Sequence, residues 1–385
     1  MELNSDKISP IMLKLGVNAR ILSDPALRGW SRYTVNLLRE LSELGVDLFL
    51  YSDAPLSENH LAALPKGSFH ERVSRVKPYF LWEQVWLPKQ CLKDKIDLLH
   101  CPFNFGLPRV SSCPRVLTLH DAIHEVQVRE KGGEWGWKYW VGQTYFWIAK
   151  TSAERILTVS EHAKQDLIKY LGITEEKIKV VYEAADPLFH KTVSSEQREG
   201  VRKEFGLKNP YFFYIGGWEK RKNLSFLIQA FAHALLEEVD LVLAGGGDAA
   251  SQEQLKKIAG DLGISSRVRF LGRIEDAKLP ALYAGALSFV YPSSYEGFGL
   301  QICEALAVGC PVLAARATSL PEVLGAGGEF FELSDEKTLV ELLRKMVSNQ
   351  DYLNEMRIRA KTRSLDFSWK KTALETLKVY EEILK

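Results

Sequence analysis

Two glutamates, Glu296 and Glu304, lie on either side of a glycine-rich turn and carry the clearest chemical signal in the chain. The apolar run at 286–291 predicts a buried strand before the turn, and residues 300–308 predict a short helix that ends at Gly309. The first backbone N–H groups of such a helix lack partners within it, and its macrodipole is positive at that end. A diphosphate would be bound there without a metal ion.

The two carboxylates are placed to contact the sugar parts of a ligand whose diphosphate lies at this turn. Glu304 comes about one turn into the helix, where it can accept hydrogen bonds from ribose hydroxyls. Glu296 precedes the turn and can reach a second sugar, while Gly297 and Gly299 let an anion approach the backbone closely. The spacing predicts a nucleotide-sugar site. The alternative is two solvated glutamates beside an ordinary strand-to-helix turn.

Two further segments carry charged or polar side chains at the ends of predicted strands. His120 and Asp121 follow a short apolar run, where ligands of open α/β sheets bind; a packed histidine beside a capping aspartate is the alternative. Arg221 and Lys222 lie between a predicted strand and a helix, so two cations can oppose the negative charge that develops on a leaving diphosphate. A cluster of solvated charges is the alternative for that pair.

In their order along the chain, these motifs resemble those of the family-four retaining glycosyltransferases, which have two Rossmann-like domains facing across a cleft. The stretch from Tyr291 to Glu304 carries the two glutamates of that family with seven residues between them. The other landmarks occur in the expected order, and the resemblance covers nearly the whole chain. They are Arg28-Gly-Trp-Ser-Arg-Tyr33, Leu117-Thr-Leu-His-Asp121, Thr158-Val-Ser-Glu-His162, Gly216-Gly-Trp-Glu-Lys-Arg-Lys-Asn223, Leu243-Ala-Gly-Gly-Gly247 and Phe270-Leu-Gly272.

The resemblance implies a role for each matching residue. The residues implied in catalysis are His120, Arg221, Lys222 and Glu296. The residues implied in donor binding are Gly29, Gly217, Leu271, Arg273, Gly297, Phe298, Gly299, Leu300 and Glu304, although a tight structural turn is an equal alternative for Leu271 to Arg273. The acceptor-side candidates are Arg32, Asp121 and His124. Many members carry an arginine where this chain has Gly217, so we expect Arg221 and Lys222 to meet the diphosphate charge.

Short apolar runs alternate with amphipathic segments, which predicts an α/β protein with two doubly wound parallel sheets. The pattern restarts after a polar linker near residues 187–200. We expect an N-terminal, acceptor-side domain formed by residues 1–187 and 366–385, and a C-terminal, nucleotide-sugar-binding domain at 188–365. In the resembled family the last helix, predicted here to begin at a Ser368 cap, returns to the first domain.

Composition excludes several classes of protein. The 385 residues are 46% hydrophobic with a net charge of +1, which lacks the basic excess of a nucleic-acid-binding protein. The five cysteines form no C-x-x-C pair, no D-x-D sequence occurs, and the histidines lack metal-ligand spacing, so we expect no metal and no cofactor. No signal-peptide pattern or apolar span of membrane length is present, which favours a cytoplasmic protein whose membrane contact can only be peripheral, at the inner face.

Aromatic residues crowd the segment 135–147. On a helix, Trp137, Trp140, Thr144 and Trp147 would share one face. We expect that face to belong to the core, with binding at a membrane interface as the alternative. The segment 66–95, which mixes basic and aromatic residues, is a second candidate for contact with a lipid-linked acceptor.

The sequence as a whole predicts a retaining, metal-independent hexosyltransferase. Its partners would be a GDP- or UDP-linked sugar donor and a glycan or lipid-linked glycan acceptor, in surface polysaccharide or lipopolysaccharide synthesis. The segments 81–88 and 98–104 resemble bacterial mannosyltransferase-type members, which makes GDP-mannose the first donor to consider. A nucleotide-sugar epimerase on the same fold and a non-catalytic sugar-nucleotide-binding protein are the alternatives. A nicotinamide dehydrogenase would share the sheets, but its G-x-G-x-x-G fingerprint is missing.

Overall fold

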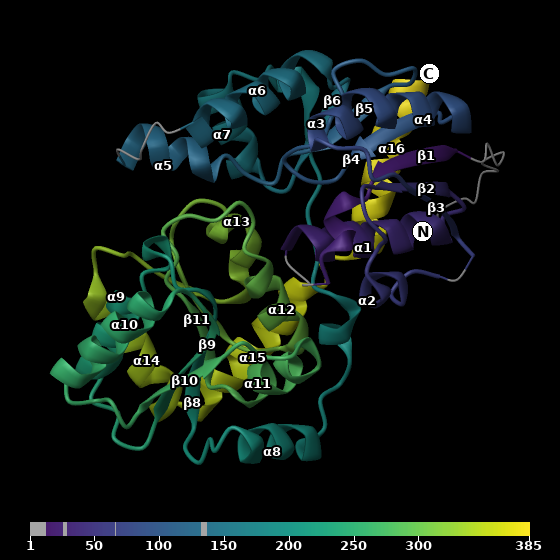
Figure 1. Ribbon diagram of the computed structural model, residues 1–385. Helices are drawn as coiled ribbons and strands as arrows, with labels where there is room; N and C mark the ends of the chain where they lie inside the picture. Colours follow the sequence, from purple (N-terminus) through teal and green to yellow (C-terminus); the bar gives the residue numbers. More distant parts are fainter. Residues whose placement is uncertain (1–12, 26–28, 66, 132–136) are drawn as a thin grey trace. The chain divides into compact units, whose positions relative to one another are not determined.

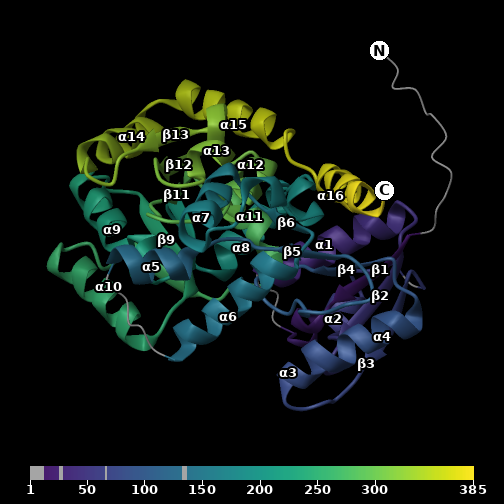
Figure 2. The same cartoon turned by 90° about the horizontal axis from the view of Figure 1, so that it is seen from above.

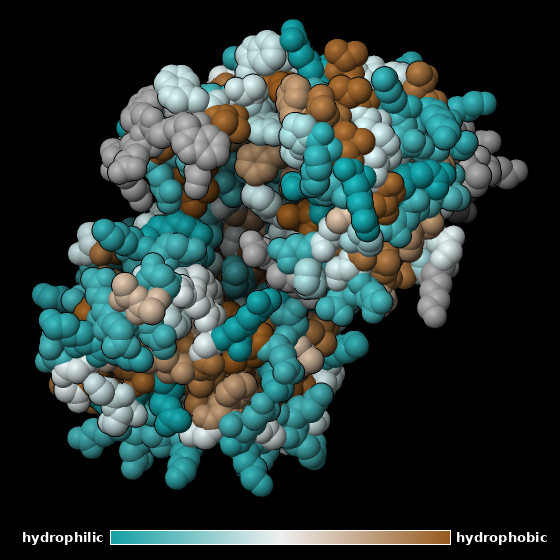
Figure 3. Space-filling model, in the orientation of Figure 1, coloured by the Kyte–Doolittle hydropathy of each residue, from teal (hydrophilic) through white to brown (hydrophobic). Residues whose placement is uncertain are grey.

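The computed structural model describes residues 13–25, 29–65, 67–131 and 137–385. The chain divides into two compact units (Figure 1). The first comprises the described residues up to Val159, then Lys164–Val181 and Trp369–Lys385, and the second comprises Ser160–Ala163 and Tyr182–Ser368. Hydrophilic side chains cover much of the face drawn in Figure 3, with apolar ones between them.

The first unit is built on a seven-stranded parallel sheet of order β3-β2-β1-β4-β5-β6-β7. Its strands are β1 (Lys14–Asn18), β2 (Asp47–Ser52), β3 (Phe69–Val73), β4 (Leu98–Cys101), β5 (Arg115–Thr118), β6 (Arg155–Thr158) and β7 (Ile178–Val180). Its helices are α1 (Gly29–Glu43), α2 (Glu58–Leu61), α3 (Tyr79–Leu81), α4 (Leu87–Asp94), α5 (Ile123–Lys131), α6 (Trp137–Ser152) and α16 (Trp369–Leu384), while α7 (Glu161–Leu171) begins in the segment assigned to the second unit.

The second unit is built on a six-stranded parallel sheet of order β10-β9-β8-β11-β12-β13. Its strands are β8 (Tyr211–Gly217), β9 (Asp240–Gly246), β10 (Val268–Gly272), β11 (Ser288–Tyr291), β12 (Val312–Ala315) and β13 (Glu329–Phe331). Its helices are α8 (Ser195–Glu204), α9 (Leu224–His233), α10 (Ala249–Asp261), α11 (Leu279–Gly285), α12 (Leu300–Val308), α13 (Leu320–Leu324), α14 (Glu336–Ser348) and α15 (Gln350–Ser364).

The sequence explains why both sheets are parallel and buried. Every residue of β11 and β12 is buried, as expected of strands covered on both faces, whose sequences read as continuous apolar runs. The prediction of two doubly wound parallel sheets is confirmed. Because parallel strands all end at the same edge of a sheet, the loops that follow β8 and β11, which are neighbours, lie side by side.

The last helix is held to the first unit by a buried histidine. Figures 1 and 2 both show α16 beside α1, and the Tyr380 hydroxyl of α16 lies 2.7 Å from His100 Nδ1 on β4. The other ring nitrogen, Nε2, lies 2.8 Å from Thr118 Oγ1. Burial, with a smaller effect of nearby His120, lowers the pKa of His100 to about 3. The ring is therefore neutral in the folded chain, and both nitrogens have partners.

We expect the folded first unit to lose stability as the pH falls below about 6.5, the ordinary pKa of histidine. The unfolded chain binds a proton on His100 in that range and the folded chain does not, so stability is full above pH 6.5 and declines toward pH 3. At pH 5 the loss amounts to about 2 kcal/mol. Urea unfolding at pH 7 and pH 5 measures it. His100→Gln is the control and should show a smaller pH dependence; the same dependence in both proteins would contradict the prediction.

Candidate functional site

Glu296 lies at the centre of a cluster of charges in the second unit, in which Lys222 is buried and Glu296 and Arg221 are mostly buried. Its Oε1 accepts hydrogen bonds from Lys222 Nζ at 2.5 Å, from Arg221 Nη1 at 3.0 Å and from the Tyr291 hydroxyl at 3.0 Å. Arg221 also donates to the carbonyl of Tyr295 at 2.9 Å. Lys222 and Arg221 follow β8 and Glu296 follows β11, so one carboxylate joins the loops at the ends of two adjacent strands.

Burial and charge pairing act in opposite directions on the pKa of Glu296. Burial alone would raise it, but attraction to Lys222 and Arg221 outweighs burial and holds the pKa below its ordinary value. For Lys222, burial and repulsion from Arg221 together lower the pKa against the attraction of Glu296. The Glu296 carboxylate is therefore ionised at neutral pH. It positions two cations and can accept from a ligand hydroxyl, but it is poorly suited to donate a proton.

The glycine turn leads directly into α12, and its geometry requires glycine at one position. Gly299, the residue before α12, has a φ of +103°, and a Cβ there would lie 2.9 Å from Leu320 Cδ2. No side chain caps the helix at Gly299. The backbone N–H groups at the start of α12 therefore have no side-chain cap, and uncapped helix N-termini of this kind bind anions.

The predicted donor residues around this turn differ in what their side chains do. Glu304, on α12, is 3% exposed and accepts a hydrogen bond from the Tyr283 hydroxyl of α11 at 3.0 Å. Phe298 is buried and its ring packs against Tyr182 and Phe367, so its side chain belongs to the core of the unit. The hydrogen bond from Tyr283 holds the Glu304 carboxylate in place. Ribose binding by that carboxylate stays a prediction.

The remaining donor residues lie at the ends of β8 and β10. Gly217 ends β8, and a Cβ there would overlap the carboxylate of Glu219. The position where many relatives carry arginine is thus faced by an acidic side chain in this protein. At the end of β10, Leu271 is half-buried and Arg273 is exposed, and Gly272 between them has a φ of +68°, as in a tight turn.

On the first unit, His120 lies directly after β5 and is almost fully buried. Its backbone N–H donates to Asn104 Oδ1 at 2.8 Å, and its Nε2 lies 3.1 Å from the carbonyl oxygen of Pro102. The ring stacks with Trp30 at 6.1 Å and meets Tyr33 edge to face at 4.7 Å. The backbone and the side chain of His120 are therefore both fixed, and its catalytic role stays a prediction.

The predicted acceptor-side residues lie near this histidine. Asp121 Oδ1 accepts the N–H of Ile123 at the start of α5, at 3.0 Å, and so caps that helix. Asp121 and His124 both line a cavity of about 610 Å³ in the first unit. Gly29 and Arg32 lie in the first turn of α1, whereas Arg28, which begins their motif, lies outside the described residues.

The expectation that the aromatic face of α6 is part of the core is wrong. Trp140 is 61% exposed and Trp147 is 47% exposed, and Thr144 between them is exposed as well. The Trp137 side chain lies outside the described part of the chain. The opposite face of α6, with Phe146 and Ile148, is the buried one. Helical spacing identified the stripe but not the side of the helix that packs on the sheet.

Among the described residues, no group of three histidine, cysteine, aspartate or glutamate side chains could hold a metal ion. None of the helices in the described ranges is long and apolar enough to cross a membrane. All five cysteines are free and buried.

The two parallel sheets, each in its own compact unit, define a two-domain α/β protein. Two family models match consecutive parts of the chain: Glycosyltransferase Family 4 at residues 27–187 and Glycosyl transferases group 1 at residues 195–363. The chain belongs to the family-four glycosyltransferases, and the resemblance inferred from its motifs is confirmed.

Curated relatives include several mannosyltransferases. The O-antigen chain mannosyltransferase B of Escherichia coli is 31% identical over 235 residues, covering 60% of this chain and 61% of that protein. The serotype-specific mannosyltransferase WbdA of Escherichia coli is 29% identical over 238 residues, covering 60% of this chain and 29% of that protein. The chain therefore spans less than two thirds of the length of these two relatives. The MMP alpha-(1->4)-mannosyltransferase of Mycolicibacterium hassiacum is 28% identical, covering 92% of this chain and 95% of that protein.

Solved structures show the same fold at low sequence identity. A glycosyltransferase from Rickettsia africae has a TM-score of 0.76 and 17% identity, covering 97% of this chain and 99% of its own. Anabaena HepE, in complex with UDP and glucose, has a TM-score of 0.75 and 19% identity, covering 96% and 99%. The glycosyltransferase-B architecture inferred from the sequence is confirmed.

The buried charge cluster predicts strong energetic coupling. We expect Glu296→Gln to destabilise the second unit by about 3 to 5 kcal/mol, because Lys222 and Arg221 then lie buried without their anion. Lys222→Met in the Glu296→Gln background should recover part of that loss. Chemical denaturation of the four proteins of this double-mutant cycle measures the coupling.

The matched control is the exposed pair Glu253 and Lys256 on α10, which lie 2.8 Å apart. A cycle on that pair should give less than about 1 kcal/mol. If the losses at Glu296 and Lys222 are additive, the coupling free energy of this pair is as small as that of the exposed pair. That result would show that the cluster is not held together by charge.

Proposed function

We propose that this protein is a retaining hexosyltransferase that transfers mannose from GDP-mannose to a hydroxyl of a glycan or lipid-linked glycan acceptor. Such a reaction belongs to the synthesis of surface polysaccharide or lipopolysaccharide. The observation that carries the proposal is the cluster of Glu296, Lys222 and Arg221 beside the uncapped start of α12. The mannosyltransferases of Escherichia coli and Mycolicibacterium hassiacum among its relatives support mannose as the sugar.

The geometry of the cluster suits departure of a nucleoside diphosphate. Negative charge grows on the leaving diphosphate as the bond between it and the anomeric carbon of the donor sugar breaks. Lys222 and Arg221 are already positioned to stabilise that charge. Two fixed cations and the N-terminus of α12 supply the charge stabilisation that a metal ion supplies in other transferases, so we infer that no metal is required. In a retaining transfer on one face of the sugar, the leaving phosphate accepts the proton of the acceptor hydroxyl, and no side-chain nucleophile is needed.

We expect the enzyme to transfer from GDP-mannose in preference to UDP-glucose, UDP-galactose or UDP-N-acetylglucosamine, with the α-configuration retained and activity preserved in a chelator. Arg221→Ala and Glu296→Ala should each lower kcat by about 100-fold or more, because the first removes a cation that stabilises the growing negative charge and the second removes the carboxylate that positions Arg221 and Lys222. Radiolabelled transfer and NMR of the product measure these outcomes. Glu253→Gln, an exposed change on the same unit, is the control and should keep full activity.

The assay also separates the alternatives. An epimerase would change the sugar of the donor without an acceptor, and a non-catalytic protein would bind GDP-mannose without turnover. Full turnover by Glu296→Ala would overturn the proposed site.

We further infer that the protein is cytoplasmic and contacts the membrane peripherally through α6. Trp140, Val141 and Trp147 are all exposed on this helix, and large aromatic side chains with a polar tip favour the membrane interface. The Arg109 guanidinium lies 4.8 Å from the Trp147 ring centroid, and Lys150 is exposed in the last turn of α6. Basic side chains beside exposed tryptophans suit a surface of anionic lipid.

We expect the double variant Trp140→Gln/Trp147→Gln to bind vesicles of phosphatidylcholine and phosphatidylglycerol at least about tenfold more weakly than the parent, because it loses the apolar area that enters the interface. Co-sedimentation measures binding. Ile358→Gln, a change of an exposed apolar residue on α15, is the control. Equal vesicle binding by the parent and the double variant would contradict membrane contact through α6.

A further inference from the structure

A cavity of about 610 Å³ in the first unit has mostly apolar walls. This volume lies within the range of ordinary small-molecule sites. Six aromatic side chains line it, with three aliphatic ones and Gly142. Those lining residues are Trp30, Tyr79, Phe103, Phe105, Tyr145, Phe146, Ala122, Ile123, Val141 and Gly142. The polar lining residues are Arg20, Asn104, Asp121 and His124.

The aromatic wall is a connected set of rings. Trp30 meets Phe105 edge to face at 5.9 Å, and Phe105 meets Tyr145 edge to face at 5.6 Å. Edge-to-face contacts of this kind are favourable and hold the rings in fixed orientations. Phe105 is 36% exposed and Val141 is 44% exposed, so the apolar lining continues to the surface of the unit. A chain or ring entering past Phe105 and Val141 would meet mostly apolar surface.

Three of the four polar lining residues, Asn104, Asp121 and His124, lie close together. Asn104 donates its side-chain N–H to the carbonyl of Asp121 at 3.4 Å and accepts the backbone N–H of His120. Asp121 and His124 belong to the same short segment after β5, which carries the predicted acceptor residues. Arg20 lies apart from them, with its guanidinium paired to Asp53 at 3.0 Å and over the Tyr79 ring at 4.1 Å.

A group of polar side chains in an otherwise mostly apolar, aromatic lining points to an amphiphilic occupant. A purely polar oligosaccharide would lose its water among the aromatic rings and gain few hydrogen bonds there, since only Tyr79 and Tyr145 among them carry hydroxyls, at a cost for each hydroxyl left unpaired. An apolar group would be stabilised there in proportion to the area that it buries. Resting on the proposed function, we propose that this cavity binds an apolar group of the acceptor, an alkyl or isoprenoid chain, while the acceptor's sugar lies beside Asn104, Asp121 and His124.

Two acceptors that share a sugar test the proposal: methyl α-mannoside and octyl α-mannoside, the latter below its critical micelle concentration. The expected KM of the octyl compound is at least tenfold lower at similar kcat. Gly142→Leu fills the cavity, because a Cβ at Gly142 has only Phe146 within 4.0 Å and leucine suits a helix better than glycine. This variant should raise the octyl KM to the methyl value and leave the methyl KM unchanged.

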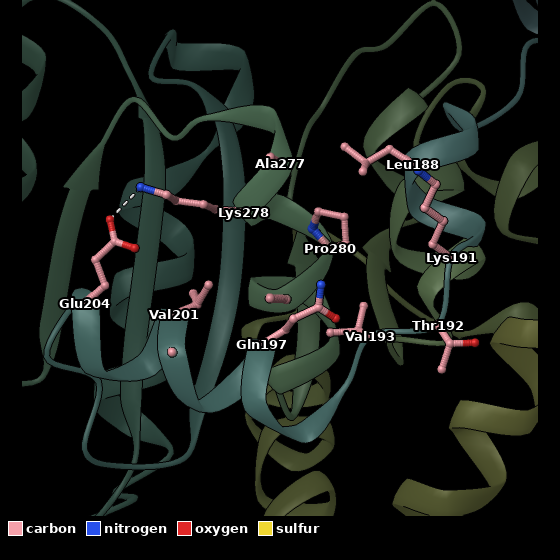
Figure 4. A pocket seen from close by; sticks show the side chains of 12 residues that line it. Leu188, Lys191, Thr192, Val193, Gln197, Val201, Glu204, Ala277, Lys278 and Pro280 are labelled. Carbon is pink, nitrogen blue, oxygen red and sulfur yellow. Dashed lines mark hydrogen bonds and ion pairs between the residues drawn. The ribbon is translucent and has the colours of Figure 1, made fainter.

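The matched control is the same substitution at another helical glycine. Gly200 on α8 has no atom within 4 Å of its Cβ position and lines a separate cavity of about 400 Å³ in the second unit. Figure 4 shows that cavity, where Lys278 and Glu204 point toward each other and pair at 2.6 Å. Gly200→Leu should leave both KM values unchanged.

Binding without the donor keeps this inference separate from the proposed function. Thermal stabilisation by octyl α-mannoside, absent with methyl α-mannoside and lost in Gly142→Leu, supports the cavity even if neither mannoside is a substrate. Equal behaviour of the two mannosides, or stabilisation by the octyl compound that survives in Gly142→Leu, overturns the inference and leaves the transferase proposal standing. Absence of GDP-mannose turnover and binding overturns the proposed function alone. Faster transfer to octyl α-mannoside embedded in vesicles than to the free compound identifies a bilayer as the source of the chain.

Discussion

The second unit depends on keeping one buried carboxylate ionised. Removing Glu296 and Lys222 from water is costly, and the cost is offset only if each charge has a partner of opposite sign and further hydrogen bonds. Arg221 and the Tyr291 hydroxyl complete that set around Glu296 Oε1. The loops after β8 and β11 are therefore fixed relative to each other before any ligand arrives. In the proposed transfer, charges that are already oriented would spend little energy on reorganisation when the diphosphate departs.

The sequence predicted most strands of each sheet and missed one edge strand of each, β3 and β13. The helix at 300–308 has the predicted bounds because Gly299 and Gly309, with φ of +103° and +81°, are local signals that need no knowledge of the fold. The central strands are buried on both faces and appear in the sequence as apolar runs. The edge strands β3 and β13 are different: Phe69–Val73 contains no fully buried residue, and Glu329–Phe331 has only three residues. Their pairing is decided by neighbouring strands, which no local pattern records.

The site was predictable where its residues carry charge and hidden where they do not. Glu296, Arg221 and Lys222 were identified from the sequence, and the structure brings them together. Tyr291 and Tyr283 were not identified, because a tyrosine in an apolar strand or helix looks like core until its hydroxyl is seen to donate to a carboxylate. The aromatic face of α6 was assigned to the wrong side for a related reason. Helical spacing groups Trp140 with Trp147, but only the position of the sheet decides which face of the helix is covered.

The two units present different chemistry, and selectivity follows from the difference. The second unit holds fixed charges, whereas the cavity of the first unit is largely aromatic, and three of its four polar lining residues, Asn104, Asp121 and His124, lie close together. An apolar pocket discriminates weakly, because one methylene more or less changes binding by only about 1 to 3 kcal/mol. Groups that hydrogen-bond a hydroxyl discriminate more sharply, since a ligand lacking that hydroxyl leaves them unpaired. An acceptor bound in this cavity would therefore be selected mainly at Asn104, Asp121 and His124, while the aromatic lining would contribute affinity and tolerate chains of different length.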